Sequence, residues 1–368
     1  MFRTQSDFAT SSPMTGDRDI AATLYDYAGA IHIHSTLSDG SGTVPEIVGD
    51  ARAAGLDFIM LTDHEHLQAR DLGYEGWHDD LLCLVGEEVT PRFHNHYLAF
   101  DIDAPVKGRG NWNQPQRFID RVAEQDGLGF IAHPIGEDYP TRAMACPWMD
   151  WSVTGFTGIE VWSYMHDWAR NVKWRNVPAA IAAPDKFIHG PHQRAVKMWD
   201  EIGQTRRVVA IGTLDIHAKK VPGIGLPRIL PYSFAFKTIR THVLLDAPLD
   251  ATDSQVAAKQ VYDAIRAGHC FMAHDGFGDS TGFYFDAQRR GKVVALMGDE
   301  LPFTAGTRLH ASVPDEAYIC LLRDGHVIEE FEGKRLSYAI TQPGVYRVEV
   351  RRRFKPWIFS NPIYVRTA

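Results

Sequence analysis

Histidine and carboxylate side chains recur at the ends of short apolar segments along the first two thirds of the sequence. The segment "GAIHIHS" carries two histidines two residues apart, and "RVVAIGTLDIH" ends in an Asp-x-His pair. In a strand, residues i and i+2 point to the same side, so each pair could bind one ion. Neutral imidazole and carboxylate are common ligands of transition metals. The residues at these segment ends are His32 and His34, Asp63 and His64, Glu88, His133, and Asp215 and His217.

The apolar segments alternate with amphipathic stretches, which indicates the elements that must position these side chains. Buried strands are predicted at 29–35, 57–64, 81–85, 96–100, 129–134, 157–162, 207–217, 241–247 and 270–274. Helices are predicted at 43–56, 115–127, 192–203 and 253–268. Strands and helices that alternate in this way imply an α/β fold with parallel strands. Parallel strands of a barrel bring their carboxyl ends, and with them the histidines and carboxylates, to one mouth.

The pattern of apolar and polar residues changes after about Gly276. Alternating segments flank the turn dipeptide Asp324-Gly325, and the helical periodicity is lost. We therefore divide the chain into an N-terminal extension (1–27), an α/β domain (28–276) and a small all-β, sandwich-like domain (277–368).

The composition argues against several classes of protein. The 368 residues include 38 basic and 46 acidic side chains, a formal charge of −8, and a nucleic-acid binder needs a basic face. No apolar run approaches the ~18 residues of a membrane span, and the start of the chain is unlike a secretory signal. Four widely spaced cysteines suit buried thiols better than a disulfide framework. We expect a cytoplasmic globular protein that forms no stable complex with nucleic acid or membrane.

Taken in order, "HIHSTLSDG", "TDH", "GEEVT", "AHP" and "LDIH" resemble the motifs of the PHP (polymerase and histidinol phosphatase) superfamily of metallohydrolases. The resemblance covers about residues 28–275. The tail, with "PGVYRVEV" and "WIFSNPIYV", resembles the β domain of a two-domain branch that includes carbaryl-hydrolase-like proteins. The resemblance implies a distorted (β/α)7 barrel with a cluster of two or three divalent ions (zinc, manganese or iron), followed by the small β domain.

The resemblance also implies which residues hold each ion. The first ion would take His32, His34, Glu88 and Asp215; the second would share Glu88 and add His96 and His133; the third would take Asp39, His64 and His217. Many family members have histidine where Asp39 stands, and carboxylate is a harder ligand for zinc. The occupancy of the third position is therefore the least secure part of the set.

Two ligand positions have a neighbour of the same type. The family pattern of Gly, any residue, Glu and an apolar residue selects Glu88 over Glu87. His96 is preferred over His94 because it directly precedes a predicted strand.

Three further residues are expected to act without binding metal. Asp63 is expected to orient a ligand or accept a proton. His66 is expected to support the ligands or to face the substrate. Arg142, on the loop after His133, could clamp an anionic substrate through its planar guanidinium.

The predicted function is that of a metal-dependent hydrolase acting on a small molecule. Coordinated water loses a proton near neutral pH, so hydroxide is available for attack. Phosphate mono- or diesters of a small molecule or nucleotide are the favoured substrates. The alternative is a carbamate, ester or amide hydrolysed by the same cluster. A non-catalytic PHP accessory module is the third hypothesis, disfavoured because no expected ligand position is apolar. The sequence carries no signal for an oligomeric state.

Overall fold

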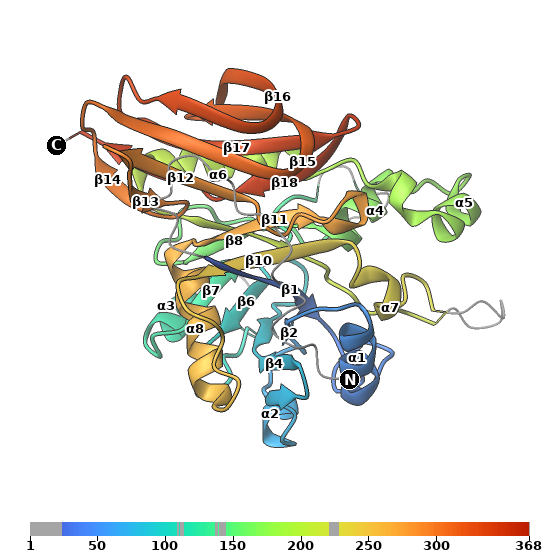
Figure 1. The fold of residues 1–368 in the computed structure, drawn as a ribbon. Coiled ribbons are helices and arrows are strands. Elements are labelled where there is room, and N and C mark those ends of the chain that lie inside the picture. Colours follow the sequence, from blue (N-terminus) through green and yellow to red (C-terminus); the bar gives the residue numbers. More distant parts are fainter. Residues whose placement is uncertain are drawn as a thin grey trace.

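The computed structural model describes residues 24–108, 110, 114–136, 139, 145–220 and 228–367. Its strands form two sheets, drawn in Figure 1. The larger sheet contains β1 (Tyr25–Ile33), β2 (Phe58–Leu61), β3 (Gly76–His78), β4 (Leu81–Val85), β10 (Ile239–Leu245), β11 (Cys270–His274), β12 (Tyr284–Arg289), β13 (Lys292–Leu296), β14 (Glu300–Pro302), β15 (Thr307–Arg323), β16 (His326–Ala339), β17 (Gly344–Arg352), β18 (Lys355–Ser360) and β19 (Ile363–Arg366). The smaller sheet contains β5 (Glu87–Val89), β6 (Tyr97–Phe100), β7 (Leu128–Ile131), β8 (Gly158–Ser163) and β9 (Val209–Thr213).

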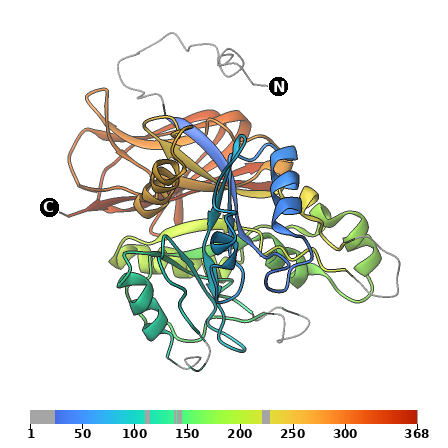
Figure 2. The same cartoon turned by 90° about the horizontal axis from the view of Figure 1, so that it is seen from below.

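The helices lie outside the sheets. They are α1 (Val44–Ala53), α2 (Gln68–Asp71), α3 (Gln116–Ala123), α4 (Tyr164–Asn171), α5 (Val177–Ala182), α6 (Gln193–Thr205), α7 (Tyr232–Ala235) and α8 (Ser254–Ala267), with 3-10 turns at Pro184–Phe187 and Asp275–Phe277. Figure 2 shows α1 and the α4–α5 segment on one side of the molecule and α3 on the other. Within the described ranges, no helix is long and apolar enough to cross a membrane.

Local sequence explains where the best-defined helices begin and end. Thr43 caps α1 through a capping box, in which its hydroxyl accepts from the Glu46 amide and the Glu46 carboxylate accepts from the Thr43 amide. The Asp253 carboxylate caps α8 by accepting from the Gln255 and Val256 amides, and Gly268 ends that helix with a left-handed φ of 75°. Each of the nine predicted strands and four predicted helices has a counterpart.

The α/β class is confirmed, whereas a closed (β/α)7 barrel is not what the strands form. Parallel pairing is limited to β1–β2–β4 and β7–β8–β9 within these sheets, apart from the short β14–β19 pair. The chain runs from β4 through β5 and β6 to β7 with antiparallel pairing in the smaller sheet, and no helix separates β4, β5 and β6. The two sheets are joined by isolated bridges, Ile33 to Ile216 and His64 to Glu88.

The part of the chain after Gly276 is built from strands, as expected. Strand β18 pairs antiparallel with β11, so these strands continue the larger sheet. Their core, which includes Trp357 and Ile358, also contains Leu244 and Phe271 from β10 and β11. The division into units at 276 and 277 stays a prediction.

The start of the chain differs from expectation in one detail. Strand β1 begins at Tyr25, so residues 25–27 belong to the sheet and not to an extension. Residues 1–23 of the expected extension lie outside the described residues.

Candidate metal centre

Glu88 is the carboxylate around which the candidate site is built. It lies on β5 and is 2% exposed. Its Oε2 atom lies 3.5 Å from Nε2 of His32 and 3.4 Å from Nε2 of His34. Its Oε1 atom lies 2.8 Å from Nδ1 of His96 and 3.1 Å from Nε2 of His133. One buried carboxylate therefore faces imidazoles on two sides, as a bridge between two ions would require.

Asp215 completes a compact four-residue group with Glu88. Its Oδ1 atom lies 3.3 Å from Nε2 of His32 and 3.4 Å from Nε2 of His34. Donor atoms about 2.1 Å from a tetrahedral ion are separated by about 3.4 Å, as simple trigonometry on the usual bond lengths gives. The four measured separations among His32, His34, Glu88 and Asp215 run from 3.3 to 3.5 Å. These imidazole–carboxylate separations are those expected of ligands that share one ion.

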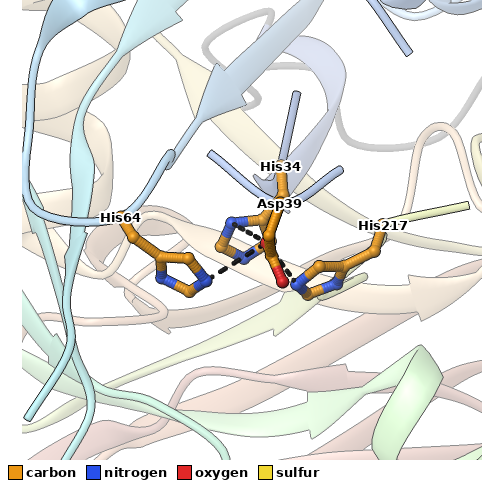
Figure 3. Close-up of side chains that lie close together, drawn as sticks. All are labelled: His34, Asp39, His64 and His217. Carbon is orange, nitrogen blue, oxygen red and sulfur yellow. Dashed lines mark ion pairs between the residues drawn. The ribbon is translucent and has the colours of Figure 1, made fainter. Parts of the chain in front are cut away.

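A second group surrounds Asp39, as Figure 3 shows. Its Oδ1 atom lies 3.2 Å from Nε2 of His64, 3.1 Å from Nε2 of His217 and 3.9 Å from Nδ1 of His34. The Asp39 side chain is 45% exposed, so this position is more open to solvent than the one at Glu88. The Nζ atom of Lys219 lies 2.8 Å from the other Asp39 oxygen and partly neutralises it. These residues form a weaker cation position than the buried group.

Several imidazole nitrogens of the site have no hydrogen-bond partner among the described residues. They are Nε2 of His32, both ring nitrogens of His34, and Nδ1 of His133 and His166, all buried. A buried polar atom without a partner costs about 1–3 kcal/mol. Of these nitrogens, Nε2 of His32 and Nε2 of His34 face the carboxylates, where a cation would supply the missing partner. The residues present therefore fit divalent ions.

The backbone is strained at three predicted ligands. His32, His133 and Asp215 have φ values of 68°, 25° and 50°. Residues other than glycine rarely adopt this left-handed region, which costs of order 1 kcal/mol or more and clusters at functional sites. His32 lies within β1 at a break in its pairing with β2, His133 follows β7, and Asp215 follows β9.

The carboxylates and imidazoles of the site shift one another's pKa values strongly. Burial alone would raise the pKa of Glu88, but the imidazoles of His96 and His32 hold it well below its usual range. Burial alone would lower the pKa of His64, but Asp39 and Glu88 raise it to about 10. The pKa of His96 is raised to about 10 against burial, mainly by Glu88. Metal binding at His64 and His96 would therefore release protons from these imidazoles.

Residues behind the ligands fix their orientation. Glu160, on β8, lies 2.8 Å from Nδ1 of His32, which leaves Nε2 of that ring free to face the carboxylates. Nε2 of His166, in the first turn of α4, lies 2.8 Å from Oδ2 of Asp215. The His166 ring also stacks on His133, with ring centroids 4.4 Å apart. Such partners orient metal ligands and tune their basicity.

Glu160 and His166 were not predicted. A glutamate inside the apolar strand "TGIEVW" is a signal that could have pointed to Glu160, because a buried carboxylate needs a partner. His166 carries no such pattern, and only the fold brings it to Asp215.

All nine predicted ligands lie together, and their roles as ligands stay a prediction.

Asp63 and His66, which were expected to act without binding metal, contact backbone and serine groups beside the ligands. Asp63 accepts from the Ser35 amide at 2.8 Å and the Ser35 hydroxyl at 2.7 Å, and so fixes the turn that leads to Asp39. His66 uses both ring nitrogens on backbone groups, the Leu37 carbonyl and the Gln68 amide.

The remaining residues considered from the sequence are Arg142 and His94. Arg142 lies outside the described residues. His94, the alternative to His96, lines a neighbouring cavity instead of facing Glu88.

That cavity has a volume of about 720 Å³. Its walls come from the loop before His96, the loop after His133 and the segment around Trp148. Phe93 and Met149 at its lining are 62% and 66% exposed, which is unusual for large apolar side chains.

Comparison with known proteins adds structural neighbours. No family model and no curated protein matches the chain. A two-domain protein from Bacteroides vulgatus containing a predicted PHP-like metal-dependent phosphoesterase aligns over 94% of this chain and 96% of its own, with 16% identity and a TM-score of 0.42. A candidate metal-dependent phosphoesterase from Bifidobacterium adolescentis aligns over 55% and 92%, with 16% identity and a TM-score of 0.32. An amidohydrolase from Chromobacterium violaceum aligns over 54% and 93%, with 17% identity and a TM-score of 0.31.

One of these neighbours is described as containing a PHP-like metal-dependent phosphoesterase and another as a metal-dependent phosphoesterase. The carbaryl-hydrolase-like branch stays a prediction. Because the TM-scores lie below 0.5, the function proposed below rests on the side chains of this chain.

Proposed function

We propose that the protein is a metal-dependent hydrolase of small-molecule esters. The observation that carries the proposal is the buried group of His32, His34, Glu88 and Asp215, in which Nε2 of each imidazole lies 3.3–3.5 Å from an oxygen of each carboxylate. Such spacing suits a divalent ion such as zinc, manganese or iron. His96 and His133 would share Glu88 with a second ion.

A third ion would be held by Asp39, His64 and His217. Bound divalent ions lower the pKa of a coordinated water toward neutrality and polarise the oxygen of the scissile bond. The protein's own part is to keep the ligand lone pairs directed inward. Glu160 does this for His32 and His166 does it for Asp215, each through a 2.8 Å contact.

Phosphate mono- or diesters are the favoured substrates. A phosphate group carries two or more anionic oxygens, which match a cluster of cations better than a neutral carbonyl does. Arg142 is proposed as an additional clamp on the phosphate. The alternative is a carbamate, ester or amide; the apolar walls of the neighbouring cavity favour it, because they could take the organic part of a neutral substrate. The nearly complete donor set argues against a non-catalytic accessory module.

The experiment that tests the proposal has two parts. Metal-free protein is reconstituted with zinc, manganese or iron(II), and bound metal is counted by elemental analysis. The loaded protein is then offered phosphate esters and carbamates in parallel. We expect two or three ions per chain and turnover of phosphate esters. Less than one ion per chain would refute the metal centre, and turnover of carbamates alone would make the alternative the better assignment.

A further inference from the structure

The 720 Å³ cavity beside the metal centre has a lining unlike the centre itself. We propose that it is a subsite for an aromatic group, so that the substrate of the metal centre is a phosphate ester with an aromatic organic part. This inference rests on the proposed function and adds the substrate class to it.

The position of the cavity places it next to the reacting groups. Its wall includes His94, two residues before the predicted ligand His96, and Pro134, directly after the predicted ligand His133. Cys146 also belongs to the wall. The cavity is therefore lined by residues next to two predicted ligands, and we infer that a group bound in it can extend from an ester bond held at Glu88.

Hydrogen bonds of Asn95 hold one part of the wall in place. The Asn95 amide donates to the Pro147 carbonyl at 3.1 Å, and the Asn95 side chain accepts from the Met149 amide at 2.6 Å. Trp148 is buried and lies beside Tyr97, with ring centroids 6.2 Å apart. A preformed concave site of this size is typical of small-molecule pockets.

The chemistry of the wall favours an aromatic occupant. Ile135, Trp148 and Trp151 supply apolar and aromatic surface, and Phe93 and Met149 add two of the most exposed large apolar side chains of the described residues. Aromatic rings pack on such side chains with a gain beyond burial alone, and methionine sulfur also makes favourable contacts with rings.

Exposed apolar side chains that gather at one cavity, as Phe93 and Met149 do, are typical of a ligand-binding surface. The Arg92 guanidinium lies 5.1 Å from the centre of the Phe93 ring, which gives this edge of the cavity a cation beside an aromatic face. An aromatic group that enters beside Phe93 would cover the exposed ring on its other side.

The test uses two phosphonates that the enzyme cannot hydrolyse, so that binding is read without turnover. Benzylphosphonate and methylphosphonate offer the same anionic group and differ in the aromatic ring. We expect the metal-loaded full chain to bind benzylphosphonate at least about tenfold more tightly in calorimetry. Phe93→Ala and Met149→Ala should each reduce this ratio severalfold. The matched control is Phe354→Ala, at a fully exposed phenylalanine in the turn between β17 and β18, which should leave the ratio as it is.

The possible outcomes distinguish a failure of the aromatic subsite from a failure of the proposed phosphoesterase activity. Equal affinity for the two phosphonates, or a ratio that survives both Phe93→Ala and Met149→Ala, would overturn the subsite. A preserved preference for benzylphosphonate in a protein that hydrolyses neither benzyl nor methyl phosphate would refute the proposed phosphoesterase while supporting the subsite. Both variants lie at exposed positions, so their folding is expected to be intact, and circular dichroism checks this.

Discussion

The neighbouring carboxylates Glu87 and Glu88 offer a sharp test of the bridging role. Glu88 faces His32, His34 and His96 within 3.5 Å, whereas Glu87, though fully buried, accepts a hydrogen bond from the Val106 amide. We expect Glu88→Gln to weaken two ions at once, because an amide supplies neither the charge nor a second anionic oxygen. Glu87→Gln makes the same carboxylate-to-amide change at the adjacent position, and this variant should retain both ions.

The magnitude follows from how close Glu88 lies to both groups. Replacing a residue that merely supports a ligand usually weakens metal affinity by 10–100-fold. A direct bridging carboxylate should exceed that range, so we expect about 100-fold or more for each of two ions, or about 2.7 kcal/mol each. The lost binding also lowers stability, since ligands that bind only the folded state stabilise it. Burial raises the pKa of Glu87 to about 7, so the neutral glutamine imitates a form that this side chain already adopts near neutral pH.

The assay is metal content by elemental analysis after dialysis against a graded chelator, together with thermal unfolding with and without metal. Wild type and Glu87→Gln should keep the same number of ions at each chelator concentration, and Glu88→Gln should lose two together. Loss of one ion from Glu88→Gln would refute the bridge. Loss of both ions from Glu87→Gln would show that the adjacent glutamate, and not Glu88, holds them.

Three further outcomes are expected. His166→Ala should lower metal affinity about 10-fold or more without unfolding the protein, measured by chelator competition, because it removes the partner of an aspartate ligand. Asp39→Ala should remove at most one ion by elemental analysis and leave the Glu88 group loaded. His242→Gln should destabilise metal-free protein most at low pH. Burial would lower the pKa of His242, but Asp26 and Asp275 raise it from 6.5 to about 10. The protonated imidazole therefore stabilises the folded protein fully below pH 6.5. This contribution to the free energy of unfolding decreases by about 1.4 kcal/mol per pH unit up to pH 10. Urea unfolding across this range should show the gap between wild type and His242→Gln narrowing as pH rises.

The period-two rule allowed each pair of ionisable residues to face one ion. His32 and His34 both face Asp215 and Glu88. For Asp215 and His217 the family resemblance instead implied two different ions. In the structure, Nε2 of His217 lies 3.1 Å from Asp39 and its Nδ1 lies 3.6 Å from Asp215, so this histidine lies between the two groups.

Sequence patterns identified the strands and helices that flank the site, but they could not predict how the strands close. The alternation of strands and helices suggested a barrel, and a barrel requires every strand to find a parallel neighbour. The short strand β5 (Glu87–Val89) was not predicted, and it pairs antiparallel with β6 in a separate sheet. Three residues carry too little periodicity for such a strand to be recognised.

A Ser-His-Asp arrangement in the structure illustrates why residue types alone do not define a site. The Ser280 hydroxyl lies 3.1 Å from Nε2 of His242, whose Nδ1 lies 2.7 Å from Asp26. These distances would suit nucleophilic catalysis, but Ser280 and His242 are both fully buried, so no substrate can reach them. The three residues instead join β1, β10 and the segment after β11, and their role is to stabilise the contact with the C-terminal strands.

The predicted ligands lie where the two sheets meet, and this explains why their grouping was easier to predict than the fold around them. The bridges from His64 to Glu88 and from Ile33 to Ile216 each join a strand end of one sheet to the other sheet. The histidines and carboxylates follow the same strand ends, so a correct assignment of those ends was sufficient to group them. The strained φ values of His32, His133 and Asp215 lie at this seam. Strain of that kind persists only where neighbouring contacts over-determine the backbone, and ions shared by ligands from both sheets would be such contacts.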